Sequence, residues 1–443
     1  MINFNPFLLQ KWTQGCWSQV PKLPLKTFCF DTREMEKCAC FLAIKNEHND
    51  GHLYVRTAQK AGASAAIVED FISDCSLPQL KVKNTLKAFQ SIAQHYRDTL
   101  TSTKIFAITG SCGKTSTKEF LATLLGPETF KTPLNFNNHL GVPFSLTKID
   151  PERHENAVIE VGINQKNEMD ILGEIIHPDI AILLNICPVH LEYFKDFETI
   201  AKEKIKLLNC AKTSIYYPKK WGYLLKKNKT TRRFEFLETS TSENFYKIDP
   251  SKTGWEITLS QQHFHLPFLL GNAAVQSFAL AIKIALDEGI APELIQTRLF
   301  QWTPLQNRGT WQHIKGKHIF LDCYNANPWA FRDSLQHFYR EKQNNRPVCY
   351  CLGSMAELGE QSSLFHQQIA SYITIRPQDM FVCIGDFAAD IERGLVASGV
   401  KTNCIATYLS LNESIPFFKK LEYNYFYVKG SHSYHLENLL AAF

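Results

Sequence analysis

The most informative stretch of this chain is Ile108-Thr109-Gly110-Ser111-Cys112-Gly113-Lys114-Thr115. An apolar run at residues 105–108, typical of a buried strand, leads into it, and residues 115–125 follow with helical spacing. Glycines let backbone N–H groups approach a phosphate closely, and a helix N-terminus adds positive charge. This order predicts a phosphate-binding loop made of Gly110, Ser111, Cys112, Gly113, Lys114, Thr115 and Ser116.

Two side chains of the loop have predictable roles. Lys114 is expected to reach the β- and γ-phosphates of a nucleotide, and the Thr115 hydroxyl is expected to bind Mg²⁺. The loop is shorter than the GxxxxGK[ST] pattern because Ile108 stands where the first glycine would be. A strand–helix turn that binds nothing is the alternative interpretation.

Strand-like runs at residues 157–161 and 180–184 alternate with helical stretches, which predicts a mainly parallel α/β sheet. Ligands collect beyond the carboxyl ends of such strands, so Glu160 is expected at the same site, where its oxygens suit Mg²⁺. His190 follows the next run. Each residue also has an ordinary structural interpretation, and nothing local distinguishes Lys204 from Lys202 or Lys206.

The whole chain divides into three α/β units, with predicted bounds 1–83, 84–302 and 303–443. The last unit repeats the strand–helix alternation, with strand-like runs at residues 318–321, 348–352, 380–384 and 425–428. Residues 215–259 are polar and weakly patterned, and we expect a small antiparallel extension there.

Composition excludes several classes of protein. With 443 residues, 44% hydrophobic and 21% charged, the chain is neither disordered nor a small disulfide-stapled domain. The net charge of +5 is spread along the sequence without a dense basic block, so we expect no nucleic-acid partner. No apolar stretch reaches the roughly 18 residues of a membrane span. The thirteen cysteines include no CxxC pair and no signal peptide precedes them, which predicts free thiols and a cytoplasmic location.

Several motifs together resemble the Mur ligase family, whose members form amide bonds with ATP in peptidoglycan synthesis. The phosphate loop is similar to the shortened loop of that family, and residues 135–143 are similar to its Asn-rich segment. Residues 324–328, 352–359 and 429–431 are most similar to the branch that adds D-alanyl-D-alanine to UDP-N-acetylmuramoyl-tripeptide. The resemblance covers nearly the whole chain.

The resemblance implies a UDP-binding first unit, a P-loop ATPase-type central unit and a Rossmann-like last unit. It implies ATP with two Mg²⁺ sites and an acyl-phosphate intermediate. Catalytic roles fall on Lys114, His190 and a Lys204 that CO₂ carbamylates, and metal ligation on Thr115, Glu160, His190 and Lys204. Nucleotide contacts beyond the loop fall on Arg308, Asp322 and Asn325. UDP-peptide contacts fall on Asp31, Thr32, Arg33, Asp50, Asn137 and Asn138.

Several positions depart from the family pattern and keep alternatives open. Ser277 stands where an adenine-contacting Asn is expected, and changes also fall at Ala273, Ala274, Leu321, Ser354 and His432. One alternative is another Mur ligase or a folylpolyglutamate-type ligase. Another is a non-catalytic homologue that only binds nucleotide-sugar peptide. We expect a monomer in either case.

Overall fold

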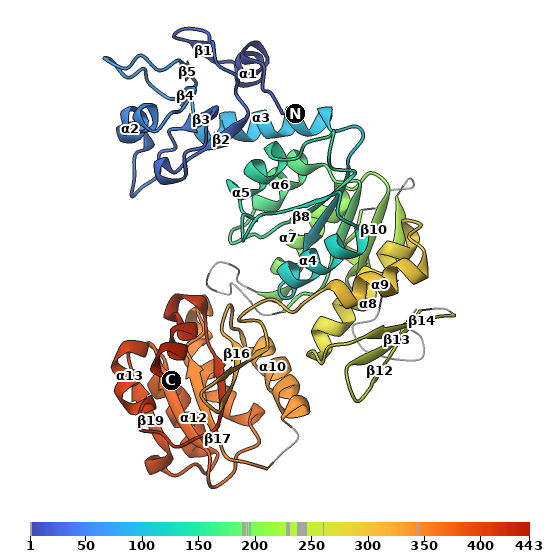
Figure 1. Ribbon diagram of the computed structural model, residues 1–443, viewed down its shortest axis with the longest axis vertical. Helices are drawn as coiled ribbons and strands as arrows, with labels where there is room; N and C mark the ends of the chain where they lie inside the picture. Colours follow the sequence, from blue (N-terminus) through green and yellow to red (C-terminus); the bar gives the residue numbers. More distant parts are fainter. Residues whose placement is uncertain are drawn as a thin grey trace.

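The computed structural model describes residues 2–187, 192, 194, 196–226, 231–236, 246–259, 261–342 and 345–443. Its first sheet has five strands in the order β1-β5-β4-β3-β2 (Figure 1). These strands are β1 (Cys16–Trp17), β2 (Thr27–Cys29), β3 (Ala39–Leu42), β4 (Ala65–Val68) and β5 (Gln79–Lys81). The helices nearby are α1 (Pro6–Thr13), α2 (Val55–Lys60) and α3 (Thr85–Thr99).

The second sheet has six parallel strands in the order β11-β10-β9-β6-β8-β7. They are β6 (Lys104–Thr109), β7 (Thr129–Lys131), β8 (Asn156–Glu160), β9 (Ile180–Leu183), β10 (Ser214–Pro218) and β11 (Arg232–Phe236). Its helices are α4 (Lys114–Leu125), α5 (Gly141–Thr147), α6 (Glu168–Ile176), α7 (Phe197–Asn209), α8 (Asn272–Asp287) and α9 (Pro292–Gln301).

Residues 215–259 differ in part from the expected antiparallel extension. Strands β10 and β11 instead pair in parallel and widen the central sheet. Only β12 (Tyr246–Pro250), β13 (Trp255–Leu259) and β14 (Gln262–Leu266) form a separate antiparallel sheet. The inner face of this small sheet is apolar, with Trp255 and Ile257 buried, and it packs against α8. The alternation of apolar and polar residues over such short strands is too weak to show which sheet each strand joins.

The third sheet has the order β15-β16-β20-β17-β18-β19. All its pairings are parallel except the edge hairpin β15–β16. The strands are β15 (Thr310–Ile314), β16 (Lys317–Asp322), β17 (Val348–Gly353), β18 (Met380–Ile384), β19 (Ile405–Tyr408) and β20 (Tyr425–Lys429). The helices are α10 (Pro328–Glu341), α11 (Ser362–Gln368), α12 (Ala388–Ala397) and α13 (Leu411–Phe418). The expected α/β class with parallel sheets is therefore confirmed.

Helix α3 joins the first unit to the second. One continuous apolar cluster includes Phe28 of the first sheet, Phe89 and Ile92 of α3, and Ile105 of β6. The helix packs on α1 and also on α5 and α6. The bounds of the three units stay predictions, since this shared core gives no sharp division.

Strand β6 lies at the centre of the second sheet, and this fixes the position of the site. Its neighbours are β8 and β9, with Ile108 paired to Glu160 and Thr109 paired to Leu183. The loops that follow these three parallel strands therefore meet at one edge of the sheet. The described residues contain no helix that is long and apolar enough to cross a bilayer.

Phe120 anchors α4 against α8, and its loss should destabilise the central unit. Its ring is fully buried and stacks on Phe278 with 3.9 Å between ring centroids. We expect Phe120→Ala to lower the free energy of unfolding by about 3–5 kcal/mol, measured by urea titration. Phe300→Ala is the control, because that ring is 58% exposed and its loss should change stability by less than about 0.5 kcal/mol. Equal effects of the two substitutions would contradict this packing.

Candidate active site

Hydrogen bonds to the segment after β9 hold the phosphate loop in place. The Ser111 N–H donates to the Asn185 carbonyl at 3.0 Å, and the Cys112 N–H donates to Asn185 Oδ1 at 2.9 Å. Gly113 has a φ of +79°, a left-handed conformation that favours glycine, and it directs the chain into α4. The loop therefore has the shape that its sequence predicts, with Lys114 at the first position of the helix.

Two lysine side chains converge on one carbonyl oxygen of this loop. Lys114 Nζ lies 2.9 Å from the Gly110 oxygen, and Lys204 Nζ, from α7, lies 3.2 Å from the same atom. Lys204 is 1% exposed. Burial, and then the charge of Lys114, hold the pKa of Lys204 well below its usual value. Its amine is thereby favoured in the neutral form, which can act as a nucleophile.

Glu160 lies beside the loop, and one of its two carboxylate oxygens accepts hydrogen bonds. Oε1 accepts hydrogen bonds from Thr115 Oγ1 at 3.2 Å and from Asn137 Nδ2 at 2.8 Å. Oε2 is buried without a hydrogen bond, and Lys118 Nζ lies 3.9 Å away. A hydroxyl and a carboxylate with one free oxygen are the donors that Mg²⁺ prefers. The residues present at this site therefore fit a magnesium ion.

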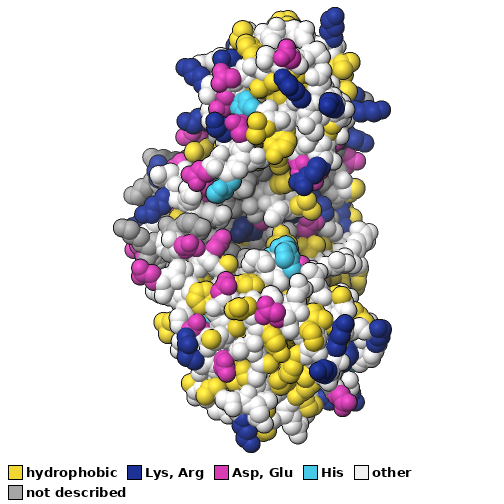
Figure 2. Space-filling view, turned by 90° about the vertical axis from the view of Figure 1, so that its left-hand side faces the viewer, with side chains coloured by type: hydrophobic (Ala, Val, Ile, Leu, Met, Phe, Trp, Pro, Cys, Tyr) yellow, Lys and Arg dark blue, Asp and Glu magenta, His cyan; other side chains and the backbone are white. Residues whose placement is uncertain are grey.

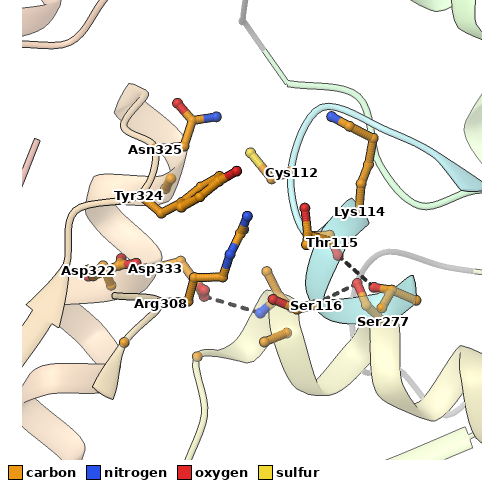
Figure 3. Close-up of a pocket in the computed structure, with 18 of the residues that line it drawn as sticks. Cys112, Lys114, Thr115, Ser116, Ser277, Arg308, Asp322, Tyr324, Asn325 and Asp333 are labelled. Carbon is orange, nitrogen blue, oxygen red and sulfur yellow. Dashed lines mark hydrogen bonds between the residues drawn. The ribbon is translucent and has the colours of Figure 1, made fainter. Parts of the chain in front are cut away.

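The opposite wall of the site belongs to the C-terminal unit. Residues of both units line one cavity of about 290 Å³. Figure 3 shows Arg308, Tyr324 and Asn325 on one side of it and the phosphate loop on the other. The Arg308 guanidinium lies over the Tyr324 ring, 3.9 Å from its centroid. Lys429 Nζ pairs with Asp322 Oδ2 at 2.7 Å.

Direct hydrogen bonds hold the two walls together. Asn327 Nδ2 lies 3.1 Å from Cys112 Sγ, and Asp333 Oδ1 accepts from the Ala273 N–H at the start of α8. Arg340 adds two bonds of 3.0 Å to residues 270 and 272. The C-terminal unit is thus closed over the phosphate loop.

Most residues that the sequence predicts for nucleotide and metal lie together. The cavity is lined by Ser111, Cys112, Gly113, Lys114, Thr115, Ser116, Asn137, Glu160, Arg308, Asp322 and Asn325. Gly110, the first residue of the loop, is not among the lining residues, and its carbonyl accepts a hydrogen bond from the buried Lys204. His190 falls outside the described residues.

The predicted UDP-peptide residues are not part of this cavity, except Asn137. Asp31 pairs with Arg33 at 2.6 Å in the first unit, and the Arg33 hydrogen bonds lower the pKa of Asp31 to about 2. Asp50 accepts from the His52 backbone N–H at 3.0 Å. Asn138 Oδ1 accepts from two backbone N–H groups at the start of α5. The roles of these residues in binding a substrate remain predictions.

Lys118 and Asn185 carried no recognisable signal in the sequence, whereas Ser277 stands out there as a departure from the family pattern. Lys118 lies one helical turn after Lys114 and is fully buried against Glu160, although its sequence context is that of an ordinary helix. Asn185 anchors the loop, and the position of an Asn after a strand gives no hint of that contact. Ser277, at the position where the family pattern has Asn, lines the cavity, and its hydroxyl donates to the Ala273 carbonyl of its own helix at 3.0 Å.

Cys112 is in an unusual environment for a thiol. Its pKa is lowered to about 7, mainly by a hydrogen bond from the Cys187 thiol. The Asn327 amide and the charges of Lys114 and Lys429 lower the pKa further, and together these effects outweigh desolvation by burial, which raises it. Burial instead raises the pKa of the strand thiols Cys40, Cys349 and Cys351. All thirteen cysteines are free thiols, as the sequence predicts.

The fold and the site define a phosphate-loop protein whose nucleotide cavity lies between two α/β units. Residues 108–284 match the Mur ligase middle domain, and residues 308–416 match the Mur ligase, glutamate ligase domain. The UDP-N-acetylmuramoyl-tripeptide--D-alanyl-D-alanine ligase of Bacillus subtilis (strain 168) is 30% identical over 381 residues, 82% of this chain and 81% of that protein. The chain belongs to the Mur ligase family.

Solved structures agree with this assignment. A crystal structure of MurF from Acinetobacter baumannii has a TM-score of 0.85 at 28% identity, covering 99% of this chain and 98% of that one. The MurF ligase of Thermotoga maritima, solved in complex with ADP, has the same fold, with a TM-score of 0.79 at 21% identity over 95% and 97% of the two chains.

The low pKa of Cys112 predicts how its alkylation depends on pH. The thiolate is the reactive form, so the rate should rise as pH increases through the pKa and level off above it. Alkylation of Cys112 by iodoacetamide, followed by peptide mass mapping, should reach half its maximum rate near pH 7. For an ordinary thiol, the alkylation rate reaches half its maximum at about pH 8.5. A midpoint at that ordinary value would contradict the described environment.

Proposed function

We propose that this chain is the ligase that adds D-alanyl-D-alanine to UDP-N-acetylmuramoyl-tripeptide, with ATP consumed to ADP and phosphate. The observation that supports it most is the single cavity in which the phosphate loop faces Arg308 and Lys429 of the other unit. Such a cavity can hold a nucleotide triphosphate in contact with both units. The names of the relatives described above give the substrate class.

In the first step, the terminal carboxylate of the tripeptide attacks the γ-phosphorus of ATP. The P–O bond to ADP breaks and an acyl-phosphate forms. Lys114 leaves the Gly110 carbonyl to contact the transferring phosphoryl group, and Arg308 offsets its charge from the opposite wall. Electrostatic stabilisation of this kind supplies most of the rate enhancement in such transfers.

Magnesium fits the donors described above. Thr115 and the free oxygen of Glu160 would hold it, with His190 and a carbamylated Lys204 proposed as further ligands. When bound, Mg²⁺ supplies positive charge beside the phosphate oxygens. The neutral amine of Lys204 can attack CO₂, forming an N–C bond and releasing a proton, and this places an anion beside Lys114 where a neutral amine stood.

In the second step, the amine of D-alanyl-D-alanine attacks the acyl carbon. A tetrahedral intermediate forms and collapses, and phosphate leaves as the amide forms. Closure of the C-terminal unit on the loop, through Asn327 and Asp333, excludes water that would hydrolyse the acyl-phosphate. The predicted UDP-sugar contacts of the first unit would hold the substrate at its other end.

Two of the departures from the family pattern, Leu321 and Ser354, lie away from the phosphate loop and do not favour the non-catalytic alternative, whereas Ala273, Ala274 and Ser277 line the cavity. Leu321 is a core residue of β16, 1% exposed, and the buried Ser354 hydroxyl bonds to the Ile384 carbonyl. Neither touches the phosphate loop or Glu160. A binding-only protein has no use for the pair of lysines on Gly110. A folylpolyglutamate-type ligase is the second alternative, and substrates distinguish it.

Phosphate release tests the proposal directly. Purified protein should release phosphate only when ATP, Mg²⁺, the UDP-tripeptide and D-alanyl-D-alanine are all present, with the pentapeptide product detected by mass. Release with single amino acids or glutamate in place of the dipeptide would indicate the other ligases. No release from folded protein that binds the UDP-peptide would favour the non-catalytic homologue.

Lys114→Ala should abolish this turnover, leaving at most about a thousandth of the rate, because the phosphoryl group loses its cation. The fold should persist, since within the part of the chain that the structure describes the Lys114 ammonium bonds only to a loop carbonyl. Lys131→Ala is the control, as this surface lysine pairs with Glu119 away from the cavity. An active Lys114→Ala enzyme would show that the loop does not bind the transferred phosphate.

Carbamylation of Lys204 is testable on its own. With ¹³C-bicarbonate and Mg²⁺–ADP, the protein should show a carbamate carbon in its NMR spectrum, and Lys204→Ala should remove it. Lys202→Ala should retain it, because Lys202 is exposed on the same helix and pairs with Glu198. A carbamate signal that persists in Lys204→Ala would disprove the assignment.

A further inference from the structure

Two cysteines lie near each other at the phosphate loop: Cys112 in the loop itself and Cys187 in the segment after β9. The Cys112 N–H donates to Asn185 Oδ1 at 2.9 Å, and the Cys187 sulfur lies 3.9 Å from the same oxygen. The Cys187 thiol donates its one hydrogen to the Cys112 sulfur. Ser111 Oγ ties the backbones together by accepting from the Cys187 N–H at 2.8 Å. The Cys187 thiol therefore lies close to the backbone and the sulfur of Cys112, although the two residues are 75 positions apart in sequence.

The two thiols differ in how easily a reagent from the cavity can reach them. Cys112 is half-buried and lines the nucleotide cavity, and Figure 3 shows its sulfur directed toward the C-terminal unit. Cys187 is 4% exposed. A reagent that enters the cavity would therefore meet Cys112 first, with Cys187 behind it.

The charges around Cys112 favour a reactive thiolate. The sulfur accepts from Asn327 Nδ2 at 3.1 Å, and the lysines 114 and 429 lie close enough to stabilise a negative charge. A low-pKa, accessible cysteine beside a second cysteine is the arrangement of redox-sensing thiols. The sheet cysteines 349, 351 and 383 also lie near one another, but all three are buried in apolar cores and are unreactive by the same criteria.

We propose that Cys112 is a peroxide-modification site and that Cys187 resolves the oxidised product to a Cys112–Cys187 disulfide. The Cys112 thiolate attacks one oxygen of the peroxide, the O–O bond breaks, and a sulfenic acid forms while hydroxide or alkoxide leaves. The Cys187 sulfur then attacks the sulfenic sulfur, and the S–O bond breaks with release of water. The two thiols lose two electrons in total, and the peroxide gains them.

This disulfide would switch off nucleotide binding, an effect that rests on the proposed function. It would pull the middle of the phosphate loop toward the segment after β9 and remove the Asn327–Cys112 contact between the two units. Both changes disturb the wall on which the phosphates of ATP would lie. A nucleotide that occupies the cavity would in turn shield Cys112 from the peroxide.

The full-length protein, treated with hydrogen peroxide and digested without reduction, provides the test. We expect a peptide pair that joins residues 112 and 187, lighter by two hydrogens, and at least tenfold less of it when Mg²⁺–ATP is present. Cys187→Ser should stop at the sulfenic acid, trapped on Cys112 by dimedone. Cys16→Ser is the matched control, because Cys16 is exposed in the first unit, and it should form the disulfide as the parent does.

Ligase turnover and mass mapping give separate results. Loss of turnover in parallel with the disulfide, and its return with dithiothreitol, would support the proposal. If the disulfide forms in a protein that shows no turnover even before oxidation, the result would support the modification site. It would contradict the proposed ligase function instead. An active protein in which peroxide leaves both cysteines unmodified, or in which Cys112 pairs with a different cysteine, would overturn the inference.

Discussion

Two lysine side chains that converge on the Gly110 carbonyl oxygen form the electrostatic centre of this protein. Like charges this close, one of them buried, repel each other strongly unless one loses its proton or an anion arrives. In the proposed mechanism, phosphate oxygens would relieve the repulsion at Lys114, and a carbamate would relieve it at Lys204. The proposed nucleotide, CO₂ and metal beside Glu160 all follow from this one crowded position.

The sheet topology explains why these groups meet. Strand β6 lies between β8 and β9, so the phosphate loop, Glu160 and Asn185 follow neighbouring strands. The C-terminal unit then adds positive charge from the opposite side of the cavity, through Arg308 and Lys429. Elsewhere on the face that Figure 2 shows, basic side chains are scattered among acidic ones, so positive charge is not gathered into one broad patch.

Much of the fold could be predicted from the sequence because its main strands are short, buried and bounded by polar turns. Residues 65–68 and 380–384 have the predicted bounds, and the phosphate loop has the predicted form. The edge strands β15 and β19 escaped prediction because their residues are only half-buried and lack a clear apolar pattern. Lys118 and Asn185 could not be found, since their roles depend on contacts between distant segments.

The proposed mechanism requires one nucleotide to contact both units at once. A crystal structure with a non-hydrolysable ATP analogue and Mg²⁺ would show whether it does. We expect the γ-phosphate within hydrogen-bonding distance of both Lys114 Nζ and the Arg308 guanidinium, with the metal on Thr115 and Glu160. A nucleotide bound in the cavity with its phosphates away from the loop, or with Arg308 still stacked on Tyr324 and out of reach, would contradict it.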